Sequence, residues 1–343
     1  SLGADYLFDE KEKAYRITHI INGDSWKNNS PLRNLGVEIN EGDFIIAING
    51  EELNSKITPN ALLVNRAKSY VNVTIKSATT GKTKIFNIKT NATDFDARYR
   101  EWVENKRKYV HEKSNGKLGY VHIPDMGPDG FSEFHRYYLD ESSRDGLVVD
   151  IRDNGGGHVS QLILELPSRK QLGYDLSRYG STGTYPSHSV AGAIVCITDE
   201  YAGSDGDIFS HNFKQMKLGT LVGKRTWGGV IGINPRLALA DGTLTTQPEY
   251  ATYMNDVGWG VENYGTDPDI EVEISPKDYA EGKDPQLDKA ISVVLNQLKK
   301  NPVKIPKFDK KPKLNLPLFN ISTNGNGSHK KKVSNKTNVK QKS

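Results

Sequence analysis

The stretch best suited to chemistry is residues 201–209, read Tyr-Ala-Gly-Ser-Asp-Gly-Asp-Ile-Phe, with Ser204 as the candidate nucleophile. Residues 192–198 before it are apolar and β-branched, which predicts a buried parallel strand, and apolar residues recur at helical spacing from Ile208 to Met216. A serine at such a strand-to-helix turn lies at the carboxyl edge of a sheet, beside backbone N–H groups that can stabilise an oxyanion. This geometry suits acyl transfer. Helix capping by the serine is the alternative.

The residues around this turn predict an α/β domain. From residue 118 onward, strands are expected at 119–123, 146–151, 192–198 and 219–223, with helices at 131–138, 159–166 and after Ser204. This alternation implies a mostly parallel sheet with its site at the carboxyl edge. An amphipathic helix over residues 285–298 closes the domain, which is expected to span residues 116–298.

The first 91 residues predict a separate, β-rich module. Strands are expected at 15–21, 43–48, 71–75 and 85–88, with a hairpin at Asn49-Gly50 and a short helix over 59–69 that starts at a proline. The pattern of residues 30–37 and 41–53 resembles the PDZ module of bacterial proteases, whose groove binds peptide C-termini by strand addition. The corresponding loop falls at residues 2–4, and a rigid spacer without a ligand is the alternative. Residues 92–115 predict a connecting helix.

Composition limits the possible classes of protein. The 343 residues carry a formal charge of +4, but the 13 lysines and one aspartate of residues 299–343 contribute +12, which leaves −8 on residues 1–298. A lysine-rich tail with four prolines predicts disorder rather than a nucleic-acid or membrane surface. No apolar run is long enough to span a membrane. The single cysteine, Cys196, falls inside an expected buried strand, and the carboxylates lack metal-ligand spacing, so no cofactor or metal is expected.

Three segments together resemble the carboxyl-terminal half of tricorn-like serine proteases, relatives of the C-terminal processing proteases. These are residues 150–158 (Asp-Ile-Arg-Asp-Asn-Gly-Gly-Gly-His), 201–207 (Tyr-Ala-Gly-Ser-Asp-Gly-Asp) and 223–229 (Gly-Lys-Arg-Thr-Trp-Gly-Gly). The resemblance covers about residues 2–298. It implies a PDZ-like module followed by an α/β peptidase domain.

The resemblance also implies site residues. Ser204 falls on the nucleophile, Gly157 and Asp205 on the positions whose backbone N–H groups form the oxyanion hole, and Glu262 on the carboxylate that supports the catalytic relay. A glycine suits the first of these positions because its backbone must approach the substrate closely. Asp175 falls on an acidic position of the substrate pocket that a neighbouring subunit contributes. Each assignment has an alternative. The glycines could form a plain turn, Glu262 could be an isolated exposed glutamate, and Asp175 could be a helix-capping or surface aspartate paired with Arg178.

The general base of the family is a histidine upstream of the PDZ module, and this sequence is expected to begin after it. His188 and His211 are expected about 20 Å and about 10 Å from Ser204, from the rise per residue of a strand and a helix. His158, beside the glycine run, is the one near histidine and a poor base. The processing-protease branch instead uses a lysine about 25 residues after the serine, where this sequence has Gly229, so Lys224 is interpreted as a loop charge.

The function indicated by the resemblance is a serine endopeptidase of tricorn type that cleaves peptides or unfolded chains. It implies a cytoplasmic homo-oligomer with peptide partners and neither nucleic acid nor membrane. The alternative class is a non-catalytic PDZ-containing scaffold, in which Ser204 only caps a helix. Reaction of Ser204 with a fluorophosphonate distinguishes the two.

Overall fold

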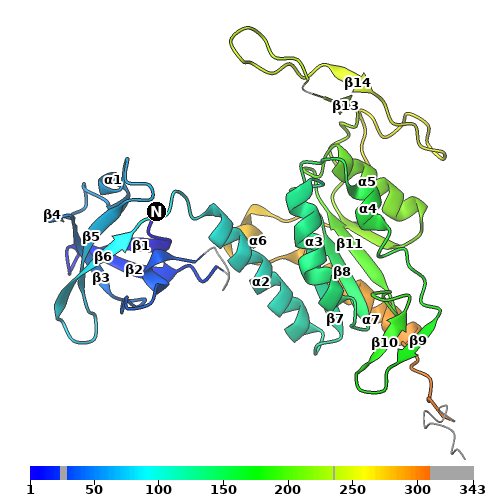
Figure 1. Ribbon diagram of the computed structural model, residues 1–343, viewed down its shortest axis with the longest axis horizontal. Coiled ribbons are helices and arrows are strands. Elements are labelled where there is room, and N and C mark those ends of the chain that lie inside the picture. Colours follow the sequence, from blue (N-terminus) through cyan, green and yellow to red (C-terminus); the bar gives the residue numbers. More distant parts are fainter. Residues whose placement is uncertain (24–28, 235, 310–343) are drawn as a thin grey trace, which may run out of the picture. The chain divides into compact units, whose positions relative to one another are not determined.

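The computed structural model describes residues 1–23, 29–234 and 236–309. The chain divides into a unit of residues 1–303 and a second unit of residues 304–343. Figure 1 shows the order of the elements along the chain. Most of the expected basic tail lies outside the described residues.

The N-terminal domain is an antiparallel β-sheet around an apolar core. Alternating apolar residues form its strands, and Ile17, Ile45 and Val73 are fully buried between them. The strand order is β1-β2-β3-β5-β6, with β4 paired to β3 through the expected Asn49-Gly50 turn. The strands are β1 (Ala4–Asp9), β2 (Ala14–Ile20), β3 (Phe44–Ile48), β4 (Glu51–Glu52), β5 (Tyr70–Lys76) and β6 (Thr83–Lys89).

Three features of this domain differ from the sequence prediction. Strand β1 (Ala4–Asp9), which pairs with β2, is not among the expected strands. Helix α1 (Pro59–Leu62) is much shorter than residues 59–69, because Asn65 and Lys68 adopt left-handed backbone conformations that end the helical ladder. A short 3-10 helix that the sequence did not predict, η1 (Pro31–Arg33), begins directly after Ser30. The Ser30 hydroxyl donates a hydrogen bond to the Leu2 carbonyl at 2.9 Å. This contact fixes the loop at residues 2–4 on the domain.

The second domain is a parallel sheet covered by helices, as the alternation of elements predicts. Its strand order is β15-β12-β11-β8-β7, with every pairing parallel. The strands are β7 (Leu118–His122), β8 (Gly146–Asp150), β11 (Ile194–Thr198), β12 (Gly219–Gly223) and β15 (Ile270–Glu271). All side chains of β7, β8 and β11 are buried, including Cys196. The predicted fold class is confirmed.

The helices of this domain pack on named strands. The connecting helix α2 (Phe95–Lys113) and α3 (Pro128–Glu141) contact β7, whereas α5 (Asp205–Gln215) contacts β11 and β12. Helix α7 (Pro285–Lys300) contacts β8, β11 and β12 and ends two residues beyond its expected end at residue 298. The short helices are α4 (Ser160–Leu164), which contacts α5, and α6 (Pro276–Ala280).

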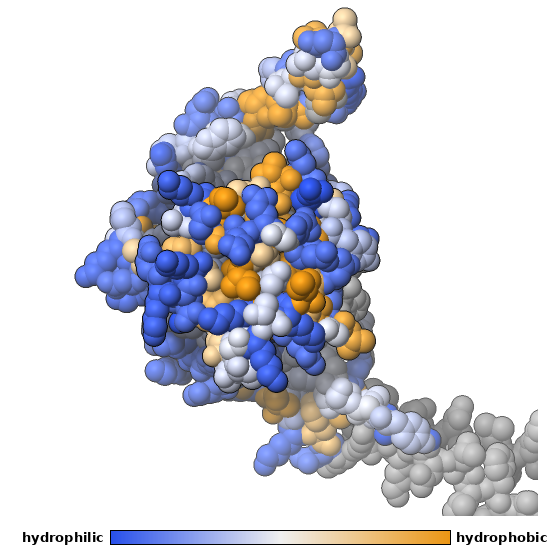
Figure 2. All heavy atoms as spheres, turned by 90° about the vertical axis from the view of Figure 1, so that its left-hand side faces the viewer, coloured by the Kyte–Doolittle hydropathy of each residue, from blue (hydrophilic) through white to orange (hydrophobic). Residues whose placement is uncertain are grey.

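Two hairpins that the sequence did not predict extend from this domain. One pairs β9 (Gly173–Leu176) with β10 (Thr182–Tyr185), and the other pairs β13 (Gly232–Ile233) with β14 (Pro248–Tyr250) at the base of a projecting arm (Figure 1). Apolar side chains lie exposed along this arm, which projects at the top of Figure 2. Among the described residues, the helices are too short or too polar for a membrane span. In the same residues, no cluster of three or more histidine, cysteine, aspartate or glutamate side chains could hold a metal ion.

Candidate active site

The turn after β11 holds Ser204 in an unusual backbone conformation. Its φ is +53° and its ψ is −118°, a sparsely populated region that costs a non-glycine residue about 1–3 kcal/mol. Ser204 occupies the N-cap position of α5, yet its side chain makes no capping hydrogen bond. The surrounding backbone holds the turn, since Gly203 donates to the Asn154 carbonyl at 2.9 Å and Gly206 to the Gly203 carbonyl at 2.8 Å. The half-buried hydroxyl is therefore not engaged as a helix cap.

The glycine loop after β8 packs against this turn. Gly156 has φ +94°, and a Cβ atom there would lie 2.6 Å from the Ser204 Cβ and 2.9 Å from the Asp205 nitrogen. Gly157 has φ +155°, and a Cβ atom there would lie 1.9 Å from the Met126 carbonyl oxygen. Any larger residue would displace this loop from the serine. The close approach thus explains the glycines as more than a plain turn.

Two backbone N–H groups beside Ser204 are available to a ligand. Within the described residues, no hydrogen-bond acceptor is found for the N–H of Gly157 or the N–H of Asp205. The neighbouring amides are used, because His158 and Val159 both donate to the Met126 carbonyl, at 2.7 and 3.0 Å. A helix N-terminus leaves its first amides free, which accounts for Asp205. Such a pair of amides suits an oxyanion.

The carboxylate of Asp205 points to the glycine loop. It accepts hydrogen bonds from the Ser160 hydroxyl at 2.5 Å and from the Ser160 N–H at 2.9 Å, and both residues are buried. Ser160 is the first residue of α4, directly after the glycine loop. From the sequence, the Asp205 carboxylate is expected only to favour the N-terminus of the helix, and its N–H group to serve the oxyanion hole. Nothing in its sequence position indicated this partner 45 residues away.

A second carboxylate, Asp199, joins the same two loops. Its carboxylate accepts hydrogen bonds from three backbone N–H groups: Asp153 at 3.0 Å, Tyr201 at 3.1 Å and Ala202 at 3.0 Å. Burial, followed by the charge of Asp153, raises the pKa of Asp199 to about 6. An aspartate that lies between the end of a strand and a turn is a typical signal for an Asx turn, which could have indicated this role.

The elevated pKa of Asp199 predicts a pH-dependent stability. Between pH 3.8 and about 6 the folded chain binds more protons at this group than the unfolded chain. Its contribution to the free energy of unfolding is therefore full below about pH 4 and is lost as the pH rises through 6. We therefore expect the unfolding temperature of wild type minus that of Asp199→Asn to decrease as the pH is raised from 4 to 7. Thermal unfolding across this range measures the difference.

The control for this prediction is Glu165→Gln, which removes an exposed carboxylate at the end of α4. Its unfolding temperature should follow that of wild type at every pH. A constant difference between wild type and Asp199→Asn from pH 4 to pH 7 would contradict the elevated pKa.

Residues 226–231 form the other wall of the site. Trp227 donates its N–H to the Ala202 carbonyl at 3.0 Å, and its exposed ring lies against Gly203, where a Cβ atom would come within 2.8 Å. Gly228 donates its N–H to the buried Asp207 carboxylate at 2.8 Å. Burial raises the pKa of Asp207, against the opposing effect of hydrogen-bond donors, of which the Thr226 hydroxyl is the strongest. This wall is fixed to the first turn of α5.

Glu262 is held by the same wall. Its carboxylate accepts the N–H groups of Val230 and Ile231, at 2.7 and 2.9 Å. It is half-buried and lines an apolar cavity of about 310 Å³ with Ile231 and Trp259. Glu262 is therefore not the isolated, exposed glutamate of the alternative interpretation. No contact joins it directly to Ser204 in the described structure.

The histidines and Lys224 have other partners. His158 is exposed and lies 3.2 Å from the Tyr250 hydroxyl, and His211 pairs with Asp256 at 2.9 Å. His188 precedes β11, whose opposite end carries Ser204, and its Nδ1 lies 3.2 Å from the Leu139 carbonyl oxygen. Lys224 forms ion pairs with two glutamates, Glu271 and Glu273. The described contacts give Ser204 no base.

Asp175 lies apart from these residues. It sits on β9, opposite Gly183 of β10, with its side chain exposed. The hairpin precedes β11, whereas Ser204 follows the carboxyl end of that strand. The structure thus brings together Ser204, Gly157, Asp205 and the wall that carries Glu262, but leaves Asp175 outside this group.

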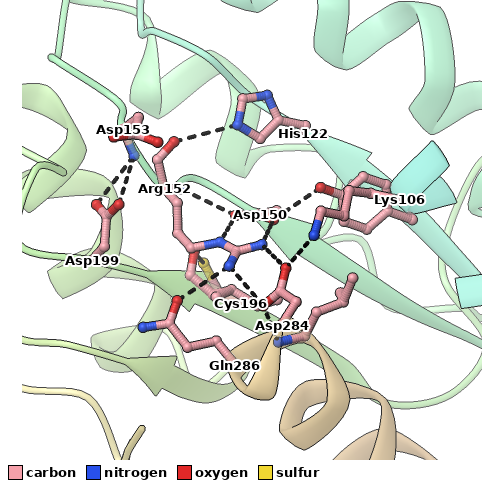
Figure 3. Close-up of polar contacts among 12 residues, drawn as sticks. Lys106, His122, Asp150, Arg152, Asp153, Cys196, Asp199, Asp284 and Gln286 are labelled. Atoms are coloured by element: carbon pink, nitrogen blue, oxygen red, sulfur yellow. Dashed lines mark hydrogen bonds and ion pairs between the residues drawn. The ribbon is translucent and has the colours of Figure 1, made fainter. Parts of the chain in front are cut away.

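A buried charge network supports the strand that leads into the glycine loop. Figure 3 shows the Arg152 guanidinium between Asp150 and Asp284, with bonds of 2.6 Å and 2.9 Å. Burial alone would raise the pKa of Asp150, but the charge of Arg152 outweighs it and lowers this pKa to about 2. The Arg152 carbonyl lies 3.3 Å from His122, whose pKa is lowered by burial. The network fixes residues 150–153 on the sheet.

Comparison with known proteins gives matches along most of the chain. Residues 117–272 match the family model for Peptidase family S41, and residues 1–92 match the Tricorn protease PDZ domain. A putative Tricorn-like protease C-terminal subunit of Sulfurisphaera tokodaii is 52% identical over 87% of this chain and 34% of its own length. A Tricorn protease homolog of Saccharolobus solfataricus is 50% identical over 87% of this chain and 28% of its own length.

A solved structure matches as well. The crystal structure of the tricorn protease superposes with a TM-score of 0.83 and 45% identity, over 87% of this chain and 29% of that chain. The chain therefore spans about a third of the length of the relatives that it matches.

Proposed function

This chain carries a tricorn-type PDZ domain followed by a peptidase domain of family S41, and from that premise we propose that it is the serine endopeptidase part of a tricorn-like protease. Its substrates are peptides or unfolded chains. One observation carries the proposal: Ser204, in a strained turn with an uncapped side chain, lies against a glycine loop, with two unpaired N–H groups beside it.

The proposed reaction is acyl transfer to Ser204. Its Oγ atom attacks the peptide carbonyl carbon, and the carbonyl oxygen becomes an oxyanion that accepts the N–H groups of Gly157 and Asp205. The amine leaves with a proton, and water then releases the acyl group and restores the hydroxyl. Glu262 supports the group that carries the proton.

The general base in this proposal is a histidine in a segment upstream of the PDZ domain. Two observations support this assignment: His158 is exposed and faces Tyr250, and His211 is paired with Asp256. The relatives are about three times as long as the aligned region, so a longer protein can carry this histidine in another domain. In this proposal that longer protein is the active species. We also propose that it works as a homo-oligomer in the cytoplasm.

Fluorophosphonate labelling tests the proposal. A fluorophosphonate should label the full-length gene product at Ser204 and should not label Ser204→Ala, because the probe reacts only with an activated serine. Ser210→Ala, which removes a buried hydroxyl from α5, is the control and should be labelled normally. Absence of labelling in the full-length wild type would favour the non-catalytic scaffold.

The exposed position of Asp175 suits a contribution to the substrate pocket of a neighbouring subunit. A carboxylate in a partly desolvated pocket favours lysine or arginine before the cleaved bond, because a charge-assisted contact contributes about 1.5–3 kcal/mol. We expect Asp175→Asn to lower the ratio of cleavage after basic residues to cleavage after apolar residues by about tenfold. Peptide cleavage by the full-length oligomer measures this ratio.

Two further measurements complete this test. Asp140→Asn, at an exposed carboxylate on α3, should leave the ratio unchanged. Dissociation of the oligomer should lower the ratio as Asp175→Asn does. An unchanged ratio in Asp175→Asn would remove Asp175 from the pocket.

A further inference from the structure

We infer that the Asp205 carboxylate is a positioning residue, which locks the glycine loop to the nucleophile turn and so sets the spacing of the two oxyanion N–H groups. The inference rests on the proposed function. It assigns the side chain a role separate from that of the Asp205 backbone.

The contacts of this carboxylate are specific and buried. Asp205 is 6% exposed and Ser160 is 4% exposed, and the two are joined by one bond to the hydroxyl and one to the backbone N–H. No lysine or arginine pairs with Asp205 in the described residues. A buried carboxylate is costly unless it is hydrogen-bonded, and here the free amides at the start of α5 also favour its charge.

Ser160 transmits this contact to the glycine loop. It is three residues after Gly157, and α4 begins at it without a capping side chain of its own, since Val159 occupies the N-cap. The Asp205 carboxylate therefore caps α4 from another element. One residue thus supplies an N–H group to the oxyanion site and holds the segment that supplies the other.

The loop has few other restraints on this side. Gly156 and Gly157 carry no side chains to pack. The Met126 backbone bonds to the Gly156 carbonyl and accepts from His158 and Val159, and the Asn154 side-chain oxygen accepts the Gly156 N–H at 2.9 Å. These bonds hold Gly156, whereas the segment after it, residues 157–160, is joined to the nucleophile turn by the Asp205–Ser160 contact and can shift when that contact is lost. Such a shift moves the Gly157 N–H group relative to the Asp205 N–H group.

The consequence is a loss of transition-state stabilisation rather than of substrate binding. Loss of one oxyanion donor lowers kcat by about 10²–10³-fold, and a displacement costs part of that. We expect Asp205→Ala to lower kcat and the rate of Ser204 fluorophosphonylation by about 10–100-fold. KM should change less than about twofold, because the uncharged carbonyl of the bound substrate interacts only weakly with the two oxyanion N–H groups.

The experiment compares four variants of the full-length gene product with wild type. Ser160→Ala keeps the backbone N–H bond and should lose about 3–10-fold in labelling rate. Ser160→Ala combined with Asp205→Ala should be no slower than Asp205→Ala alone, because both changes remove one contact. Asp205→Asn keeps an acceptor for Ser160 and should recover most of the loss seen in Asp205→Ala.

A matched control lies on α6. Ser275 and Asp278 make the same kind of serine–aspartate contact, at 2.5 Å between hydroxyl and carboxylate, within the first turn of α6 rather than between two loops. Asp278→Ala should lower the unfolding temperature without changing the labelling rate. This control separates loss of a helix cap from loss of position at Ser204.

The outcomes distinguish this inference from the proposed function. A folded Asp205→Ala that is labelled at the wild-type rate would overturn the inference alone, as would a double variant whose losses multiply. A wild type without Ser204 labelling would overturn the proposed function and the inference with it. If Asp205→Ala does not fold, the smaller change Ser160→Ala decides the question by its rate.

Discussion

Gly157→Ala is expected to lower kcat/KM of the full-length enzyme by at least about 100-fold. A Cβ atom at this position would lie 1.9 Å from the Met126 carbonyl oxygen, and the φ of +155° is unfavourable for alanine. The loop must therefore shift and carry its N–H group away from the oxyanion. Loss of one such donor costs about 10²–10³-fold. Steady-state cleavage of a peptide substrate measures the effect.

The neighbouring glycine provides the control. Gly155 has no atom within 4 Å of an added Cβ and does not have a positive φ, so Gly155→Ala should keep nearly full activity. Circular dichroism should show that both variants are folded. Equal activity of Gly157→Ala and Gly155→Ala would exclude Gly157 from the oxyanion site.

Arg152→Met is expected to lower the free energy of unfolding by about 3–5 kcal/mol. Methionine fills most of the space but leaves the fully buried Asp150 without its cation, and removal of one partner from a buried ion pair has about this cost. Asp284 keeps Lys106 at 2.7 Å, so the loss falls mainly on Asp150 (Figure 3). Chemical denaturation at pH 7 measures the change.

The pH dependence identifies the cause. The pKa of Asp150 is about 2 when it is folded beside Arg152, so its stabilising contribution is full above about pH 4 and is lost as the pH falls toward 2. The difference between wild type and Arg152→Met should therefore be largest at neutral pH and smaller below pH 4. Lys84→Met, which breaks an exposed pair with Glu38, should change stability little. A difference that is independent of pH would indicate lost packing instead.

The order of the elements could be predicted because their signals are local. Continuous apolar runs indicated β8 and β11, and helical spacing indicated α5 and α7. The turn at Asn49-Gly50 was equally clear. The end of α1 could not be predicted, because the left-handed backbone conformation of Asn65 depends on packing as well as on residue type.

The hairpins β9–β10 and β13–β14 were missed for a related reason. Their strands have two to four residues, which is too short for a period-2 pattern to be distinguished from a loop. Yet the second hairpin begins directly after Ile231, whose N–H binds Glu262, and the first hairpin carries Asp175.

The position of Ser204 between a buried strand and a helix could be predicted, because the apolar pattern of each element lies in adjacent residues. Contacts between distant segments set the rest: Ser204 does not cap the helix, Gly156 packs against Ser204, and the Asp205 carboxylate bonds to Ser160. These contacts join loops that lie 45 or more residues apart, and they form because parallel strands place their carboxyl ends at one edge of the sheet. The spacing of residues along the chain therefore does not indicate which loops lie close together.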